Sequence, residues 1–166
     1  MDLYIVRHAI AQERDASSWP NDGDRPLTPE GEAKFRKAAR GLRRLVPTVG
    51  TVLSSPFARA WRTAELLEEE AGWPAPKQQD ELRADRPARE AVRALEAVSN
   101  NEAVAVVGHE PGLSELASLL LTGTGAVTFD LKKGGVIALG LNGGARPGSA
   151  YLRWTISPKI LRSLSG

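Results

Sequence analysis

The sequence predicts an α/β fold, a three-layer α/β/α sandwich with a mostly parallel central sheet. Short apolar segments of strand length alternate with amphipathic segments of about 12–18 residues, which is typical of βαβ units. The segment 103–107 is apolar throughout, as expected for a central parallel strand covered on both faces. Near the end, strand-like segments 136–141 and 151–156 flank an Asn-Gly-Gly turn at 142–144. They predict a C-terminal hairpin that adds an antiparallel edge.

The first strand–helix unit occupies the first 47 residues. Residues 3–6 form a short buried strand by length and composition, and a polar loop with Pro and Gly follows over 12–26. Thr28 is a good N-cap and Pro29 suits the first helical position, so a helix begins there and stops at Pro47. Its predicted buried stripe comprises Phe35, Ala38, Ala39, Leu42, Leu45 and Val46.

The second unit has the same plan. A strand over 51–53 ends in Ser54-Ser55, and we expect Ser55 to cap a helix that begins at Pro56 and ends at Gly72. Its predicted stripe comprises Phe57, Ala60, Trp61, Ala64, Leu67 and Ala71.

The rest of the chain alternates in the same way. After an irregular Pro-rich stretch over 73–87, a helix is predicted over 88–98, followed by the strand 103–107 and a helix from about 112 to 121. The third helix turns Ala91, Val92 and Leu95 inward. With 166 residues and no repeat or linker, we expect a single domain over 1–166.

Composition excludes several classes of function. Lys plus Arg is 22 and Asp plus Glu is 20, and a net charge of +2 gives no reason to expect a nucleic-acid or membrane-surface partner. The absence of cysteine rules out disulfides, a thiol nucleophile and Cys-based metal sites. No apolar run approaches roughly 18 residues, and the N-terminus lacks a basic leader, so we expect a cytoplasmic protein.

Arginine and histidine side chains follow three of the predicted strands. Arg7-His8 ends the first strand, Arg59 lies in the first turn of the helix after the second, and His109 follows the strand 103–107. Ligands of open α/β sheets bind at the carboxyl ends of the strands. If these strands are neighbours, both histidines of the chain and two arginines face one crevice.

This set of side chains suits a phosphoryl group. Arginine forks and the helix N-termini near Pro56 and Pro111 attract phosphate oxygens. A neutral imidazole is a competent nucleophile toward phosphorus, and a second one, if protonated, can hold an equatorial oxygen. Each residue alone also has a structural interpretation, because a histidine after a strand or an arginine on a helix is usually not catalytic. Only the occurrence of all of these residues at the ends of strands favours a catalytic function.

Five motifs occur in order across most of the chain. They are Arg7-His8-Ala9; Arg25-Pro26-Leu27-Thr28 with Gly31; Ser54-Ser55-Pro56-Phe57 with Arg59-Ala60 and Thr63-Ala64; Glu81-Leu82; and Gly108-His109-Glu110-Pro111-Gly112. In these motifs the chain resembles the histidine phosphatase superfamily, and within it the small SixA-type phosphohistidine phosphatases. The family's usual Arg-His-Gly reads Arg-His-Ala here, which suggests that a small residue with negative φ suffices at position 9.

The resemblance implies that His8 is the nucleophile and that Arg7, Arg59 and His109 form the phosphate pocket. Glu81 is the candidate general acid, and Arg25 reaches the phosphate or supports the helix entry. No metal and no cofactor are expected. The expected activity is hydrolysis of a phosphohistidine on a partner protein, such as a histidine-containing phosphotransfer domain. The alternatives are a small-molecule phosphomonoesterase and a non-catalytic phosphate-binding module.

Overall fold

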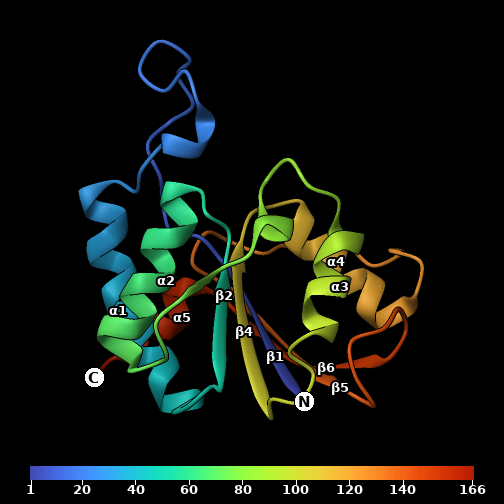
Figure 1. Ribbon diagram of the computed structural model, residues 1–166. Coiled ribbons are helices and arrows are strands. Elements are labelled where there is room, and N and C mark those ends of the chain that lie inside the picture. Colours follow the sequence, from blue (N-terminus) through green and yellow to red (C-terminus); the bar gives the residue numbers. More distant parts are fainter.

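The computed structural model describes residues 1–166 and shows one six-stranded sheet (Figure 1). The strand order is β3-β2-β4-β1-β5-β6. The strands β3, β2, β4 and β1 pair in parallel, whereas β5 and β6 pair antiparallel at the other side. The strands are β1 (Asp2–Arg7), β2 (Thr51–Ser54), β3 (Lys77–Gln78), β4 (Ala103–Gly108), β5 (Val136–Leu141) and β6 (Ala150–Ile156).

Helices cover both faces of the sheet. The residues of α1, α2 and α5 pack into one hydrophobic cluster, and those of α3 and α4 pack into a second cluster on the opposite face. Figure 1 shows α1, α2 and α5 on one side of the sheet and α3 and α4 on the other. The predicted three-layer sandwich is confirmed. The helices are α1 (Pro29–Leu45), α2 (Ala58–Ala71), α3 (Ala88–Glu96), α4 (Gly112–Thr122) and α5 (Pro158–Ser163).

The helix α1 begins as predicted. The Thr28 hydroxyl accepts the Gly31 N–H at 2.8 Å, and Pro29 is the first helical residue. Most of its predicted stripe is buried, but Leu45 is 46% exposed, so its assignment to the core was wrong. At 100° per residue, Leu45 lies about 80° from the centre of the stripe, in the last turn of the helix.

The start of α2 differs from the prediction. The helix begins at Ala58 and Phe57 occupies the N-cap position without a side-chain cap. Ser55 therefore does not cap the helix as predicted, although its hydroxyl accepts the Phe57 N–H at 3.2 Å. The helix ends as expected at Gly72, which adopts the left-handed conformation at φ 72°.

One strand and one α-helix were not foreseen. The strand β3 has only two residues and exists through its pairing with β2. The helix α5 is capped by the Ser157 hydroxyl and buries Leu161 against α1. A Cβ at Gly41 would lie 1.8 Å from the Leu161 carbonyl oxygen, so only glycine allows α1 and α5 to approach this closely.

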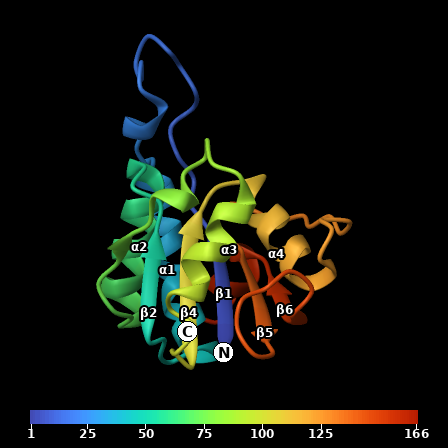
Figure 2. The ribbon, with the colours of Figure 1, turned by 45° about the vertical axis from the view of Figure 1, so that its right-hand side comes forward.

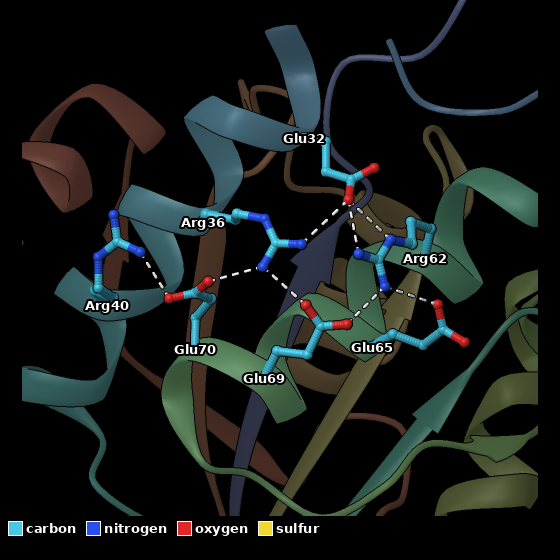
Figure 3. Close-up of polar contacts among 7 residues, drawn as sticks. All are labelled: Glu32, Arg36, Arg40, Arg62, Glu65, Glu69 and Glu70. Atoms are coloured by element: carbon cyan, nitrogen blue, oxygen red, sulfur yellow. Dashed lines mark hydrogen bonds and ion pairs between the residues drawn. The ribbon is translucent and has the colours of Figure 1, made fainter. Parts of the chain in front are cut away.

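An ion-pair network joins the outer faces of α1 and α2 (Figure 3). Arg36 of α1 contacts Glu69 and Glu70 of α2, each at 2.8 Å. In the other direction Arg62 of α2 contacts Glu32 of α1 at 2.6 Å. The network links two helices that follow the carboxyl ends of β1 and β2 in the chain. No helix of the chain is long and apolar enough to cross a membrane.

Candidate active site

The carboxyl ends of β1, β2 and β4 meet at one edge of the sheet, because β4 lies between β2 and β1. The His8 N–H donates to the Gly108 carbonyl and the Ser55 N–H to the Val107 carbonyl, both at 3.0 Å. The loop of residues 12–26 stands above this edge (Figure 2). The three strand ends are therefore neighbours, as the crevice predicted from the sequence requires.

A cavity of about 320 Å³ opens at this edge. Five of the six predicted site residues line it, and the sixth, Glu81, does not. Four arginines and one lysine line the cavity against two glutamates, which makes it attractive to anions. The lining comprises Arg7, His8, Ala11, Gln12, Glu13, Arg14, Arg25, Arg59, Ala84, His109, Glu110 and Lys133.

The imidazole of His8 is held in one tautomer. Its Nδ1 lies 2.6 Å from the Ala9 carbonyl oxygen, which can only accept, so Nδ1 carries the proton and Nε2 keeps a lone pair. Burial lowers the pKa of His8 from 6.5 to about 3; the Ala9 hydrogen bond opposes this shift, and the charges of Arg59 and Arg7 add to it. His8 is therefore neutral at pH 7. Ala9 has negative φ, as predicted, since no residue other than glycine has positive φ.

The two arginines are held from outside the cavity. Arg7 donates from Nη1 to the Leu131 carbonyl at 2.8 Å. Arg59 donates from Nη1 to the Asp22 carbonyl at 2.9 Å and from Nη2 to the Asp22 carboxylate at 3.0 Å. The Arg59 residue is only 1% exposed, so it is not an ordinary solvated charge on the surface of a helix.

The ring of His109 lies against both His8 and Phe57, with centroid distances of 5.3 Å in each case. Burial, followed by the proximity of His8 and Arg59, lowers the pKa of His109 from 6.5 to about 2. His109 is therefore neutral at pH 7 in the protein without ligand, whereas the sequence alone allowed for a protonated ring. Its Nε2 lies 2.8 Å from the Ser55 hydroxyl oxygen.

Three buried polar atoms of the site have no hydrogen-bond partner: Arg7 Nε, Arg59 Nε and His109 Nδ1. Only one further buried side-chain atom in the chain, Thr51 Oγ1, shares this property. Buried donors are normally paired, because an unsatisfied one costs roughly 1–3 kcal/mol. Their concentration around one cavity is the pattern expected of a site that binds an anion.

Sequence reasoning missed Asp22. Its carboxylate accepts from Arg25 Nε at 2.9 Å as well as from Arg59. Burial raises the pKa of Asp22, but the two guanidinium groups outweigh burial and leave it below the usual value. Arg25 also donates to the Gln12 carbonyl at 2.6 Å, so it ties the loop to the cavity wall. No local pattern pairs Asp22 with a residue 37 positions away.

The acids near the site are placed differently from the prediction. Glu81 lies in a 3₁₀ turn, Asp80–Leu82, and its carboxylate accepts from the Gln79 side-chain amide. Glu110 lines the cavity, but both of its oxygens are bonded by Ser114, from the backbone N–H at 2.9 Å and the hydroxyl at 2.5 Å. Glu110 thereby anchors the first turn of α4. No group of three or more His, Asp or Glu side chains is arranged to hold a metal ion.

Comparison with known proteins identifies the family of this chain. The model of the histidine phosphatase superfamily (branch 1) matches residues 3–84. An uncharacterized protein of Picosynechococcus sp. is 38% identical over 143 residues, which is 84% of each chain. The chain belongs to the histidine phosphatase superfamily. Membership of this superfamily points to a phosphatase.

Several solved structures have the same fold as this chain. The protein histidine phosphatase SixA complexed with tungstate is 26% identical, has a TM-score of 0.84, and matches 97% of this chain and 99% of its own. A putative phosphohistidine phosphatase SixA from Nakamurella multipartitia is 27% identical, with a TM-score of 0.77 and 95% coverage of both chains. A putative alpha-ribazole-5'-P phosphatase from Escherichia coli is 19% identical over 95% of this chain and 97% of its own, with a TM-score of 0.72, and shares the fold.

Proposed function

We propose that this histidine phosphatase removes the phosphoryl group from a histidine of another protein, through a phosphohistidine intermediate on His8 and without a metal ion. The observation that carries the proposal is the set of three unpartnered donors around a neutral His8. A phosphoryl group supplies the acceptors that Arg7, Arg59 and His109 lack, and it brings phosphorus to the nucleophile.

In the first step, His8 Nε2 attacks phosphorus in line with the leaving group. Its Nδ1–H stays on the Ala9 carbonyl at 2.6 Å, so the ring that gains the phosphoryl group becomes a cation facing a carbonyl dipole. The charge on the equatorial oxygens is held by the two guanidinium groups and by His109. The bond from phosphorus to the substrate nitrogen breaks as the bond to His8 forms.

In the second step, water attacks the phosphorus of the adduct, and the bond to His8 Nε2 breaks. The proton of the attacking water leaves with the phosphate product or passes to solvent, and His8 returns to its neutral form. The arginines supply the positive charge that Mg²⁺ supplies in other phosphoryl-transfer sites. The scarcity of carboxylates in the cavity, two among twelve lining residues, supports chemistry without a metal.

A protein substrate is supported by what lies beside the cavity. A larger hollow of about 740 Å³ is formed by the loop residues 14–16 and 19–24, by Pro56 and Phe57, and by residues 83–85. Arg14 and Ala84 line both spaces, so a broad concave surface leads to His8. The two SixA structures, at 26% and 27% identity, are those of a protein histidine phosphatase and of a putative phosphohistidine phosphatase.

The chemistry of the leaving group also supports phosphohistidine as the substrate. The predicted general acid, Glu81, lies outside the cavity, and the lining glutamate Glu110 is bonded twice by Ser114. The other lining glutamate, Glu13, belongs to the loop and has no hydrogen bond that would position it as a general acid. An alkoxide needs such an acid, whereas imidazole has a pKa near 6.5 and departs as a neutral amine when its ring is already protonated.

The test is turnover of a phosphorylated histidine-containing phosphotransfer domain, compared with small phosphate esters, with and without a chelator. His8→Ala is the control. We expect the protein substrate to be preferred, activity to survive chelation, and a phosphoryl adduct on the His8 peptide after a quench that avoids acid.

Each alternative has its own signature. Preference for sugar or nucleotide esters would identify a small-molecule phosphatase. Phosphate binding without any turnover that depends on His8 would identify a binding module. Loss of activity on chelation, with rescue by one divalent ion, would refute the metal-free step.

A further inference from the structure

The hydroxyl of Ser55 lies at the back of the site, against His109 rather than at a helix cap. Its oxygen is 2.8 Å from His109 Nε2 and accepts the Phe57 N–H at 3.2 Å. Ser55 is fully buried and His109 is 4% exposed, so neither group exchanges this contact for water easily. The contact therefore bears on which nitrogen of His109 carries the proton.

The two tautomers of His109 can be distinguished by counting hydrogen bonds. If Nε2–H donated to Ser55, the serine oxygen would receive two hydrogen bonds, its own hydrogen would have no acceptor, and Nδ1 would be a bare lone pair. If the Ser55 hydroxyl donates to Nε2, every one of these groups is satisfied except Nδ1–H. The second arrangement leaves fewer buried polar groups unpaired and is favoured.

The favoured tautomer is also the one that suits an anion. A bare lone pair on Nδ1 would repel a phosphoryl oxygen, whereas Nδ1–H donates to it. A neutral ring can make this hydrogen bond, so His109 does not need to be protonated to take part.

We infer that Ser55 is a positioning residue: its hydroxyl holds the proton of neutral His109 on Nδ1, and so turns this ring into a donor to the phosphoryl group. The inference rests on the proposed function for its effect on rate, but the tautomer itself is a property of the resting protein. Ser55 acts through His109 and does not line the cavity.

The sheet register brings the two residues together. Ser54 of β2 pairs with Val107 of β4, and Ser55 and His109 lie one and two residues beyond this last pair. The Ser55 N–H continues the ladder to the Val107 carbonyl at 3.0 Å. The Phe57 ring meets the His109 ring edge-on at 63°, which restricts its rotation. The Ser-Ser-Pro-Phe sequence thus supplies both the hydrogen bond to His109 Nε2 and the aromatic ring that restricts rotation of His109.

The direct test is ¹⁵N NMR of histidine-labelled wild-type protein without substrate. The chain has only two histidines, and the spectrum of His8→Ala assigns the other one. We expect His109 to carry its proton on Nδ1. A proton on Nε2 in the wild-type protein overturns the inference, whatever the enzyme hydrolyses.

Variants then connect the tautomer to the rate. In Ser55→Ala we expect the proton to be no longer confined to Nδ1, and kcat/KM to fall about 10–100-fold, as when the hydrogen-bond partner of a functional histidine is removed. Ser54→Ala is the matched control, because Ser54 is equally buried but its hydroxyl donates to the Ser55 carbonyl at 3.0 Å. It should keep the tautomer and the rate.

The outcomes separate the two proposals. If Ser55→Ala keeps the Nδ1 proton and a rate within a few-fold, Ser55 has no positioning role. If the wild-type protein hydrolyses no phosphorylated substrate, the proposed function fails while the tautomer result still stands.

Discussion

Replacement of Arg59 is the sharpest test of the phosphate pocket. The side chain reaches the cavity with both Nη atoms already bonded to Asp22, at 2.9 and 3.0 Å, and with Nε unpartnered. The Asp22 contacts fix the guanidinium plane, which leaves the Nε edge for a phosphoryl oxygen. Arg59→Ala removes that donor, and loss of one such donor costs about 10²–10³ in rate, or roughly 2.7–4 kcal/mol.

Arg59→Lys separates charge from geometry. A single ammonium retains the positive charge but cannot hold Asp22 with two nitrogens and offer a third, so we expect it to recover only part of the loss. The assay is kcat/KM on a phosphohistidine protein, with thermal unfolding of each variant as a check on folding. Arg62→Ala, one turn further along α2 and outside the cavity, is the control and should stay within a few-fold. An Arg59→Ala enzyme that also stays within a few-fold would refute the reasoning.

Three further outcomes are expected. Both histidines should show no titration between pH 8 and 5 in NMR, because their pKa values in the folded protein lie well below 6.5. As the pH falls below 6.5, the histidines of the unfolded chain bind protons that the folded protein does not bind. Each histidine should therefore lower the free energy of unfolding by about 2 kcal/mol at pH 5, as measured by denaturant titration. Glu81→Gln should leave hydrolysis of both an alkyl phosphate and phosphohistidine within a few-fold of wild type, because Glu81 lies outside the cavity; a large loss on the alkyl phosphate alone would show that Glu81 is a general acid after all. Arg36→Ala should lower the free energy of unfolding by about 1 kcal/mol at low salt and by less at 1 M salt, because its partners are partly exposed.

The sequence was sufficient for most of the fold because its strongest patterns are local. The apolar run of β4, the Thr28-Pro29 start of α1 and the Gly72 end of α2 each follow from the residues at that point. The helix α5 has the same kind of start, Ser157-Pro158, yet it was missed, since it is short and buries only one residue. The strand β3 has no pattern of its own and is defined by its neighbour.

Part of the site was predictable for the same reason. Arg7, His8 and His109 lie at the ends of predicted strands, and arginine and histidine are the side-chain types that suit a phosphoryl group. These positions could therefore be found without knowledge of the tertiary structure. The roles of Asp22 and Ser55 depend on contacts across 37 and 54 residues of sequence. Because a serine before a helix is usually an N-cap, nothing in the sequence indicated that Ser55 contacts His109 instead.

The loop of residues 12–26 is closed at its base, and this closure allows its outer part to vary independently of the chemistry. An isolated bridge joins Ala11 to Leu27, and the Gln12 N–H donates to the Pro26 carbonyl at 2.9 Å. Arg59 and Arg25 fasten the descending limb at Asp22. Doubling the length of the free part between these ties costs only about 0.6 kcal/mol in loop-closure entropy. Evolution or engineering can therefore exchange residues 15–20, which lie outside the cavity around His8, to change which partner binds.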